Sequence, residues 1–124
     1  MRDRSLWTWH IVAGLVILVF LGLHMAIMHL DETLGIFNPA GVHPVDWASV
    51  VLRMKSMFFA VTYVVLLGAA LYHGLYGLRN ILLELRPATG LVATLNVVLV
   101  LGGLALFVFG AYVALLAPRV AVGG

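Results

Sequence analysis

Three long runs of apolar residues, separated by short polar segments, dominate this chain of 124 residues. The runs cover about 7–30, 56–85 and 90–116. A helix needs about 20 apolar residues to cross a bilayer core of roughly 30 Å, so each run is long enough to span a membrane. The pattern predicts an all-α membrane protein with three transmembrane helices, in a single domain over residues 1–124.

The polar connection between the first two runs, at 31–55, has a pattern of its own. Within it, one face of a short helix predicted over about 45–54 is formed by Trp47, Val50, Val51 and Met54. Two interpretations stay open at this point. Either this segment is a separate interfacial helix, or the second membrane helix begins early, and an aromatic residue suits the interface in both cases.

Composition agrees with a membrane setting, since 64% of the residues are hydrophobic and only 10% are charged. The chain has no cysteine, which excludes disulfides, covalently attached c-type haem and cysteine-ligated iron–sulfur clusters within it. By the positive-inside rule, a small excess of basic residues favours an inside N-terminus. The residues on that side are Arg2, Arg4, Arg79 and Arg86, against Arg53, Lys55 and Arg119 on the other.

His73 lies near the end of the second apolar run, where an ionisable side chain is costly and its default interpretation is functional. Gly77 follows one helical turn later on the same face and removes a side chain where a flat group such as haem would fit. Arg79 comes where the helix leaves the bilayer. There it can meet a haem propionate or an anionic lipid head group.

His24 lies in a wholly apolar part of the first run, where an imidazole without a partner is unfavourable. It is therefore expected to bind a metal, as a second candidate ligand, or to meet a hydrogen-bond acceptor. The helical rise places His24 roughly 24 Å from the inner end of its helix and His73 about 16 Å from the inner end of the next. An offset of about 8 Å favours two haems, each completed by a second chain, over one shared iron. His29, two residues before Asp31, is expected at the rim.

The third apolar run carries no charge. Its glycines, Gly102, Gly103 and Gly110, predict close packing against another helix. Asn96 is expected to supply an interhelical hydrogen bond. These residues are interpreted as structural.

The motif His-Gly-x-x-Gly-x-Arg at 73–79 is followed by Glu84 and preceded in the first run by Gly-Leu-His at 22–24. With one more apolar helix after it, this arrangement resembles the hydrophobic membrane anchor subunits of succinate dehydrogenase and fumarate reductase. The smaller, D-type anchor is the most similar. The similarity covers nearly the whole chain, and its sharpest part is the stretch from His73 to Leu85.

The resemblance implies that the chain is half of a heterodimeric haem-binding helix bundle. His73 would ligate haem b, with Gly77 and Arg79 beside the cofactor, and His24 would ligate a second haem in members that have two. The implied partners are a C-type anchor subunit, an iron–sulfur subunit, a flavoprotein subunit, lipid, and quinone near the inner face, with no nucleic acid. The chain would be a non-catalytic subunit, inactive alone, in the plasma or inner membrane.

One part of the family pattern is absent. Members often have Asp-Tyr after the motif, with the tyrosine at the quinone site, whereas this chain has Glu-Leu at 84–85. Tyr72 and Tyr76 are alternative hydroxyl groups, although packing explains them more simply. Trp9 and His10, at the inner end of the first helix, could also line a quinone pocket, but an aromatic belt is the simpler account.

Three other functions are compatible with the sequence. The chain could be the cytochrome b anchor of another quinone-linked dehydrogenase, such as a formate dehydrogenase or a nitrate reductase. It could be a haem-free tether of the same family. It could also be a small transporter component in which His24 and His73 relay protons, although membrane-embedded carboxylates are missing.

Overall fold

The computed structural model describes residues 2–26, 29, 46–116 and 119. Four helices form there: α1 (Arg2–Met25), α3 (Trp47–Lys55), α4 (Met57–Glu84) and α5 (Thr89–Leu115). Within the described residues, α1, α4 and α5 are each long and apolar enough to cross a membrane. The predicted all-α membrane fold with three transmembrane helices is therefore confirmed.

The observed ends of α4 and α5 lie within one residue of the predicted ones. The first helix differs, because α1 begins at Arg2, five residues before the apolar run. The residues before the apolar run continue the same helix. One turn of it is bridged by the hydrogen bond from Thr8 Oγ1 to the Arg4 carbonyl (2.8 Å). The predicted outer end of this helix, at Leu30, lies outside the described residues.

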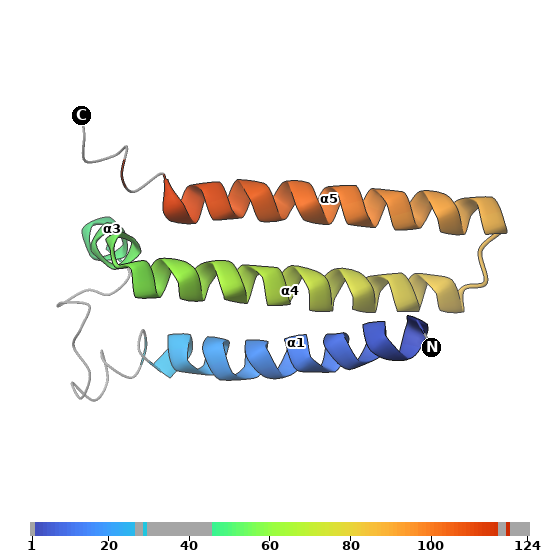
Figure 1. The fold of residues 1–124 in the computed structure, drawn as a ribbon, viewed down its shortest axis with the longest axis horizontal. Coiled ribbons are helices and arrows are strands. Elements are labelled where there is room, and N and C mark those ends of the chain that lie inside the picture. The colour runs from blue at the N-terminus through green and yellow to red at the C-terminus, as the bar shows by residue number, and fades with distance from the viewer. Residues whose placement is uncertain (1, 27–28, 30–45, 117–118, 120–124) are drawn as a thin grey trace.

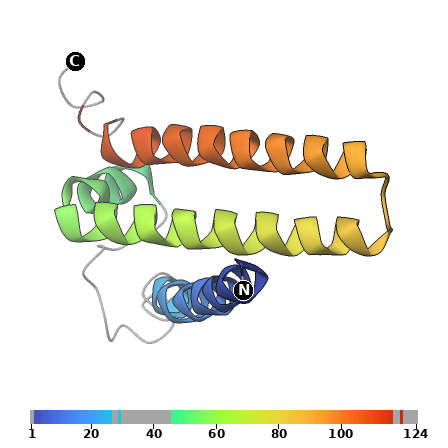
Figure 2. The ribbon, with the colours of Figure 1, turned by 45° about the vertical axis from the view of Figure 1, so that its right-hand side comes forward.

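The segment before α4 forms a helix of its own, so the second membrane helix does not begin early. Ser56 adopts an extended conformation, with φ −72° and ψ 122°, and separates α3 from α4. Val51 of α3 is buried, whereas Trp47 is exposed. Helix α3 crosses one end of the bundle and contacts α4 and α5 (Figure 2). Its position at a membrane interface stays a prediction.

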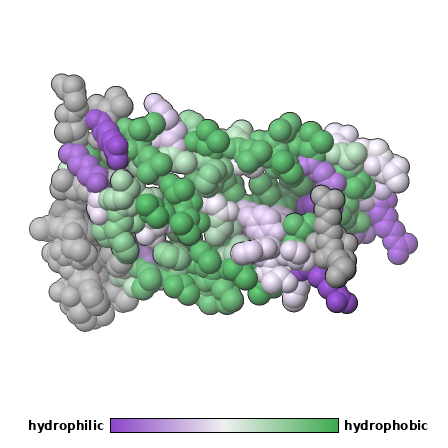
Figure 3. All heavy atoms as spheres, viewed as in Figure 1, coloured by the Kyte–Doolittle hydropathy of each residue, from purple (hydrophilic) through white to green (hydrophobic). Residues whose placement is uncertain are grey.

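Helix α4 lies between α1 and α5 and contacts both of them (Figure 1). Small residues are buried where the helices meet, namely Ala13 of α1, Ala60 of α4 and Ala114 of α5. Large apolar side chains cover the outside of the bundle, and hydrophilic residues gather mainly toward its ends (Figure 3). This distribution suits a protein surrounded by lipid, because exposed hydrocarbon is stable there and not in water.

A short link between α4 and α5 turns the chain back on itself. The backbone N–H of Leu85 donates to Leu82 O at 3.3 Å, and that of Arg86 donates to Leu83 O at 3.0 Å. Arg86 has φ 51°, in the left-handed region that commonly ends a helix, and Pro87 then prevents its continuation. The link brings the start of α5 beside the end of α4.

Candidate functional site

The predicted site residues of α4 lie on two different faces of the helix. His73 contacts α1, and Gly77 faces the same neighbour. Arg79 instead bonds to α5. Six residues of α-helix correspond to about 120° of net rotation, which accounts for the separation. The structure thus brings His73 and Gly77 together and places Arg79 apart from them.

His73 is held by a histidine of the neighbouring helix, His10 of α1. Nδ1 of His73 lies 3.1 Å from the carbonyl oxygen of His10, and both residues are half-buried. The two imidazole rings are stacked, with centroids 4.0 Å apart and an interplanar angle of 5°. Because a carbonyl oxygen only accepts hydrogen bonds, Nδ1 of His73 carries the proton, and Nε2 carries the lone pair of the neutral ring.

Two glycines make this close approach sterically possible. A Cβ atom added to Gly14 of α1 would lie 3.1 Å from Cε1 and 3.2 Å from Nδ1 of His73. A Cβ atom added to Gly77 of α4 would lie 3.5 Å from Cε1 of His10. Each histidine therefore lies against the glycine of the opposite helix. The space that Gly77 leaves open is occupied by the imidazole of His10.

His10 is the site residue that sequence reasoning missed, because it was weighed only as a quinone-pocket or aromatic-belt residue. Its Nδ1 atom is buried and has no hydrogen-bond partner within the described residues. The sequence did contain a signal. His10 and Gly14 have the same His-x-x-x-Gly spacing as His73 and Gly77, and in an antiparallel helix pair such repeats meet face to face.

His24 lies far from this pair. Its ring meets Tyr63 of α4 edge-on, with centroids 5.9 Å apart. Tyr63 is ten residues before His73, so the two histidines differ in level by about 15 Å along α4. The sequence estimate of about 8 Å was too small, because α1 begins at Arg2 and His24 is therefore deeper than predicted. His29 is exposed.

Arg79 bridges α4 to α5. Its Nε donates to Oδ1 of Asn96 at 2.6 Å, and its Nη1 donates to Oδ1 of Asn80 at 3.5 Å. The interhelical hydrogen bond predicted for Asn96 is thus confirmed. Both acceptors are uncharged amides, so neither neutralises the guanidinium, and Arg79 keeps a full positive charge near the end of α4.

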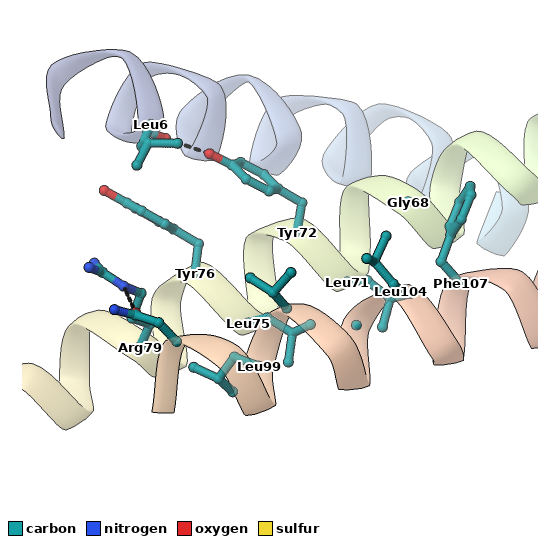
Figure 4. A pocket seen from close by; sticks show the side chains of 13 residues that line it. Leu6, Gly68, Leu71, Tyr72, Leu75, Tyr76, Arg79, Leu99, Leu104 and Phe107 are labelled. Carbon is teal, nitrogen blue, oxygen red and sulfur yellow. Dashed lines mark hydrogen bonds between the residues drawn. The ribbon is translucent and has the colours of Figure 1, made fainter. Parts of the chain in front are cut away.

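A groove of about 700 Å³ runs between α4 and α5 and is also lined by Leu6 of α1. Figure 4 shows apolar side chains along most of it and Arg79 near one end. It follows α4 from Gly68 to Arg79, which is eleven residues further along the helix, a length of about 16 Å. Such a groove suits an elongated apolar chain whose polar end meets Arg79.

Tyr72 and Tyr76 line this groove, and both also contact α1. The hydroxyl of Tyr72 donates to the carbonyl oxygen of Leu6 at 2.9 Å (Figure 4). The rings of Tyr72 and Tyr76 are stacked, with centroids 5.8 Å apart, and Tyr76 also contacts His10 at 5.2 Å. The tyrosines connect the groove to the α1–α4 contact.

Two of the three glycines singled out in α5 lie at the contact with α4. Cβ atoms added to Gly103 and Gly110 would meet Leu75 and Leu67, whereas one added to Gly102 would meet nothing within 4 Å.

Among the residues that the structure describes, no group of three or more His, Cys, Asp or Glu side chains is arranged to hold a metal ion.

Comparison with known proteins shows similarity to a succinate dehydrogenase subunit. The chain is 26% identical, over 112 residues, to the succinate dehydrogenase hydrophobic membrane anchor subunit of Thermoplasma acidophilum. The chain is similar to a succinate dehydrogenase membrane anchor. The match covers 90% of the chain and 84% of the relative, and it confirms the predicted resemblance to this kind of anchor subunit. No protein-family model matches the chain, and no solved structure matches it significantly.

Proposed function

We propose that the chain is a membrane anchor subunit of succinate dehydrogenase and that His73 binds haem b through Nε2. The observation that carries the haem assignment is the hydrogen bond between Nδ1 of His73 and the His10 carbonyl. Histidines that ligate metals usually donate their other ring N–H to a carbonyl or carboxylate, which fixes the tautomer and the ring orientation. His73 has this arrangement inside an apolar helix bundle.

The residues around His73 fit an axial haem ligand. The ring is half-buried, its ligating nitrogen bears a lone pair, and the adjacent buried Nδ1 of His10 lacks a partner within the described residues. Haem b, when bound, supplies a one-electron carrier. The residues of the chain hold the imidazole in place, exclude water with apolar helices and provide the cation of Arg79 near the membrane exit.

His10 and His73 would not hold the same iron. The nitrogen lone pairs lie in the plane of each imidazole, and the two rings are stacked in parallel planes, so the lone pairs do not converge on one point. We therefore propose that a residue of the partner anchor subunit of C type would provide the other ligand. This arrangement makes the haem site dependent on both anchor subunits.

His24 is proposed as the ligand of a second haem, which is also completed by the partner. The level difference of about 15 Å from His73 supports separate cofactors, because one iron cannot span that distance. Two haems at different levels would form an electron path across part of the bilayer. Electron transfer along it would then depend on the membrane potential.

Quinone is proposed to approach the end of α4 that carries Arg79, on the inner side. The groove between α4 and α5 supports this proposal, because its apolar length suits an isoprenoid tail and Tyr76 and Arg79 are potential hydrogen-bond donors to a quinone carbonyl. Lipid would cover the remaining apolar surface. Electrons would arrive from a flavoprotein subunit through an iron–sulfur subunit, in the plasma or inner membrane.

The deciding experiment is purification of the complex that contains this chain, followed by identification of its subunits and reduced-minus-oxidised spectra. Haem b per complex is measured for the native chain and for the His73→Ala and His24→Ala variants. His29→Ala is the matched control, because it removes an exposed histidine. We expect two haems, each variant losing a different one, and native haem content in the control.

Other outcomes separate the alternatives. A complex with the two soluble succinate dehydrogenase subunits but no haem would identify a haem-free tether. One haem that is lost only with His73→Ala would leave His24 structural. Copurification with a formate dehydrogenase or a nitrate reductase would contradict the succinate dehydrogenase assignment.

A further inference from the structure

We infer that His10 is a positioning residue that fixes the orientation and the tautomer of the His73 imidazole. The inference rests on the proposed haem ligation by His73 and adds a role for His10, which lies outside the motif at 73–79. Two separate contacts carry it, one from the backbone of His10 and one from its side chain.

The backbone contact determines which nitrogen of His73 is available. The His10 carbonyl lies within helix α1, where it also accepts the helical N–H of Gly14, and a carbonyl oxygen has lone pairs for both bonds. A side chain at Gly14 would press on the edge of the His73 ring that makes this contact. Gly14 therefore opens the carbonyl to His73.

The side-chain contact determines the plane of the ring. One face of the His73 imidazole is covered by the parallel imidazole of His10 at 4.0 Å, and the ring edge meets Gly14. The hydrogen bond fixes the direction in which Nδ1 points, and the stacking fixes the rotation of the ring about that hydrogen bond. Together they leave the imidazole one orientation in which Nε2 can act as a ligand.

Four variants of the assembled complex test this role: His10→Ala, His10→Phe, Gly14→Ala and, as the matched control, Gly22→Ala. Both glycines are in α1, so alanine raises helix propensity equally, but a Cβ atom at Gly22 meets nothing within 4 Å. His10→Phe retains a ring that can stack, and it guards against a His10→Ala variant that fails to assemble.

The readouts are haem content, the EPR spectrum of the oxidised haem, which responds to the planes of the axial imidazoles, and the midpoint potential. We expect His10→Ala and Gly14→Ala to shift both the EPR spectrum and the potential, with haem affinity reduced by roughly 10-fold or more. His10→Phe should shift them less, and Gly22→Ala should match the native complex. Native spectra and potential in both His10→Ala and Gly14→Ala would overturn the inference.

A second measurement does not require haem. In the full chain labelled with ¹⁵N-histidine, the ring nitrogen shifts of His73, assigned by comparison with His73→Gln, report which nitrogen carries the proton. We expect a proton on Nδ1, and one on Nε2 would overturn the inference. Nδ1–H in the full chain together with a haem-free native complex would instead contradict the proposed haem ligation, and with it the role of His10 toward haem.

Discussion

The imidazoles of His10 and His73 lie parallel across the contact between α1 and α4, with 4.0 Å between their centroids. The two residues are separated by 62 others in the sequence, and each packs against a glycine of the opposite helix. The orientation of His73 is therefore determined within this chain, by packing of one helix against another. A partner subunit would meet an imidazole that is already positioned.

The distance between His73 and His24 predicts that their contributions to stability are independent. Free-energy changes usually add when two sites are more than about 7–10 Å apart and share no partner, and these histidines differ in level by about 15 Å. We expect the loss of unfolding free energy in the His24→Ala/His73→Ala double variant to equal the sum of the single losses within about 0.5 kcal/mol. Thermal or denaturant unfolding in detergent measures all four forms. A larger deviation would indicate that the two ends of the bundle are coupled.

The hydrogen bond from Tyr72 to Leu6 predicts different effects for the two neighbouring tyrosines. Tyr72→Phe removes the 2.9 Å bond that ties α4 to α1 and should destabilise the chain by about 0.5–1.5 kcal/mol. Tyr76→Phe is the matched control, because the described part of the chain gives the Tyr76 hydroxyl no hydrogen bond, and it should stay within about 0.5 kcal/mol of the native chain. Equal losses in unfolding free energy for both variants would contradict this assignment.

Much of the fold was predictable because the bilayer imposes the length of each helix. Runs of apolar residues predicted α4 and α5 to within one residue, since the end of the hydrocarbon core and the link at Arg86-Pro87 coincide there. The start of α1 was not predictable in this way. A helix can continue through polar residues outside the hydrocarbon core, and a hydrophobicity pattern does not detect these additional helical turns.

The candidate site was predicted only in part, for a related reason. Sequence spacing identifies residues on one helix face, so His73 and Gly77 were correctly grouped. Arg79 was grouped with them because it lies where the helix leaves the bilayer, although its side chain turns to Asn96 of α5. The role of His10 required knowing that α1 and α4 pack antiparallel with its ring beside His73. The alignment of α1 along α4 cannot be read from a single sequence.

Close packing of α4 against α5 predicts that α5 tolerates enlargement on one side only. A Cβ atom at Gly110 would lie 2.5 Å from Cδ2 of Leu67 and would also approach its Cδ1 and Cγ, whereas Gly102 is open. We expect Gly110→Val to destabilise the chain by about 1–3 kcal/mol through overpacking. Gly102→Val, with the same change in helix propensity, should have a much smaller effect. Unfolding in detergent followed by circular dichroism makes the comparison, and similar losses for both would refute the packing explanation.

The bond between Arg79 and Asn96 predicts a measurable coupling between α4 and α5. At 2.6 Å it joins a charged donor to a neutral acceptor inside the bundle, and removing either partner leaves the other without it. Interhelical hydrogen bonds in membrane proteins average about 0.6 kcal/mol and reach about 1.7, so the coupling should lie in or somewhat above this range.

A double-mutant cycle measures this coupling with Arg79→Gln, Asn96→Leu and the combined variant. Asn80→Leu replaces Asn96→Leu in the control cycle, because its contact with Arg79 is long, at 3.5 Å, and lies within α4. We expect the first cycle to give a clear interaction free energy and the control cycle to give a value near zero. If the two cycles gave the same value, the charge of Arg79 would not be held by α5, and its place at the end of the groove would need another explanation.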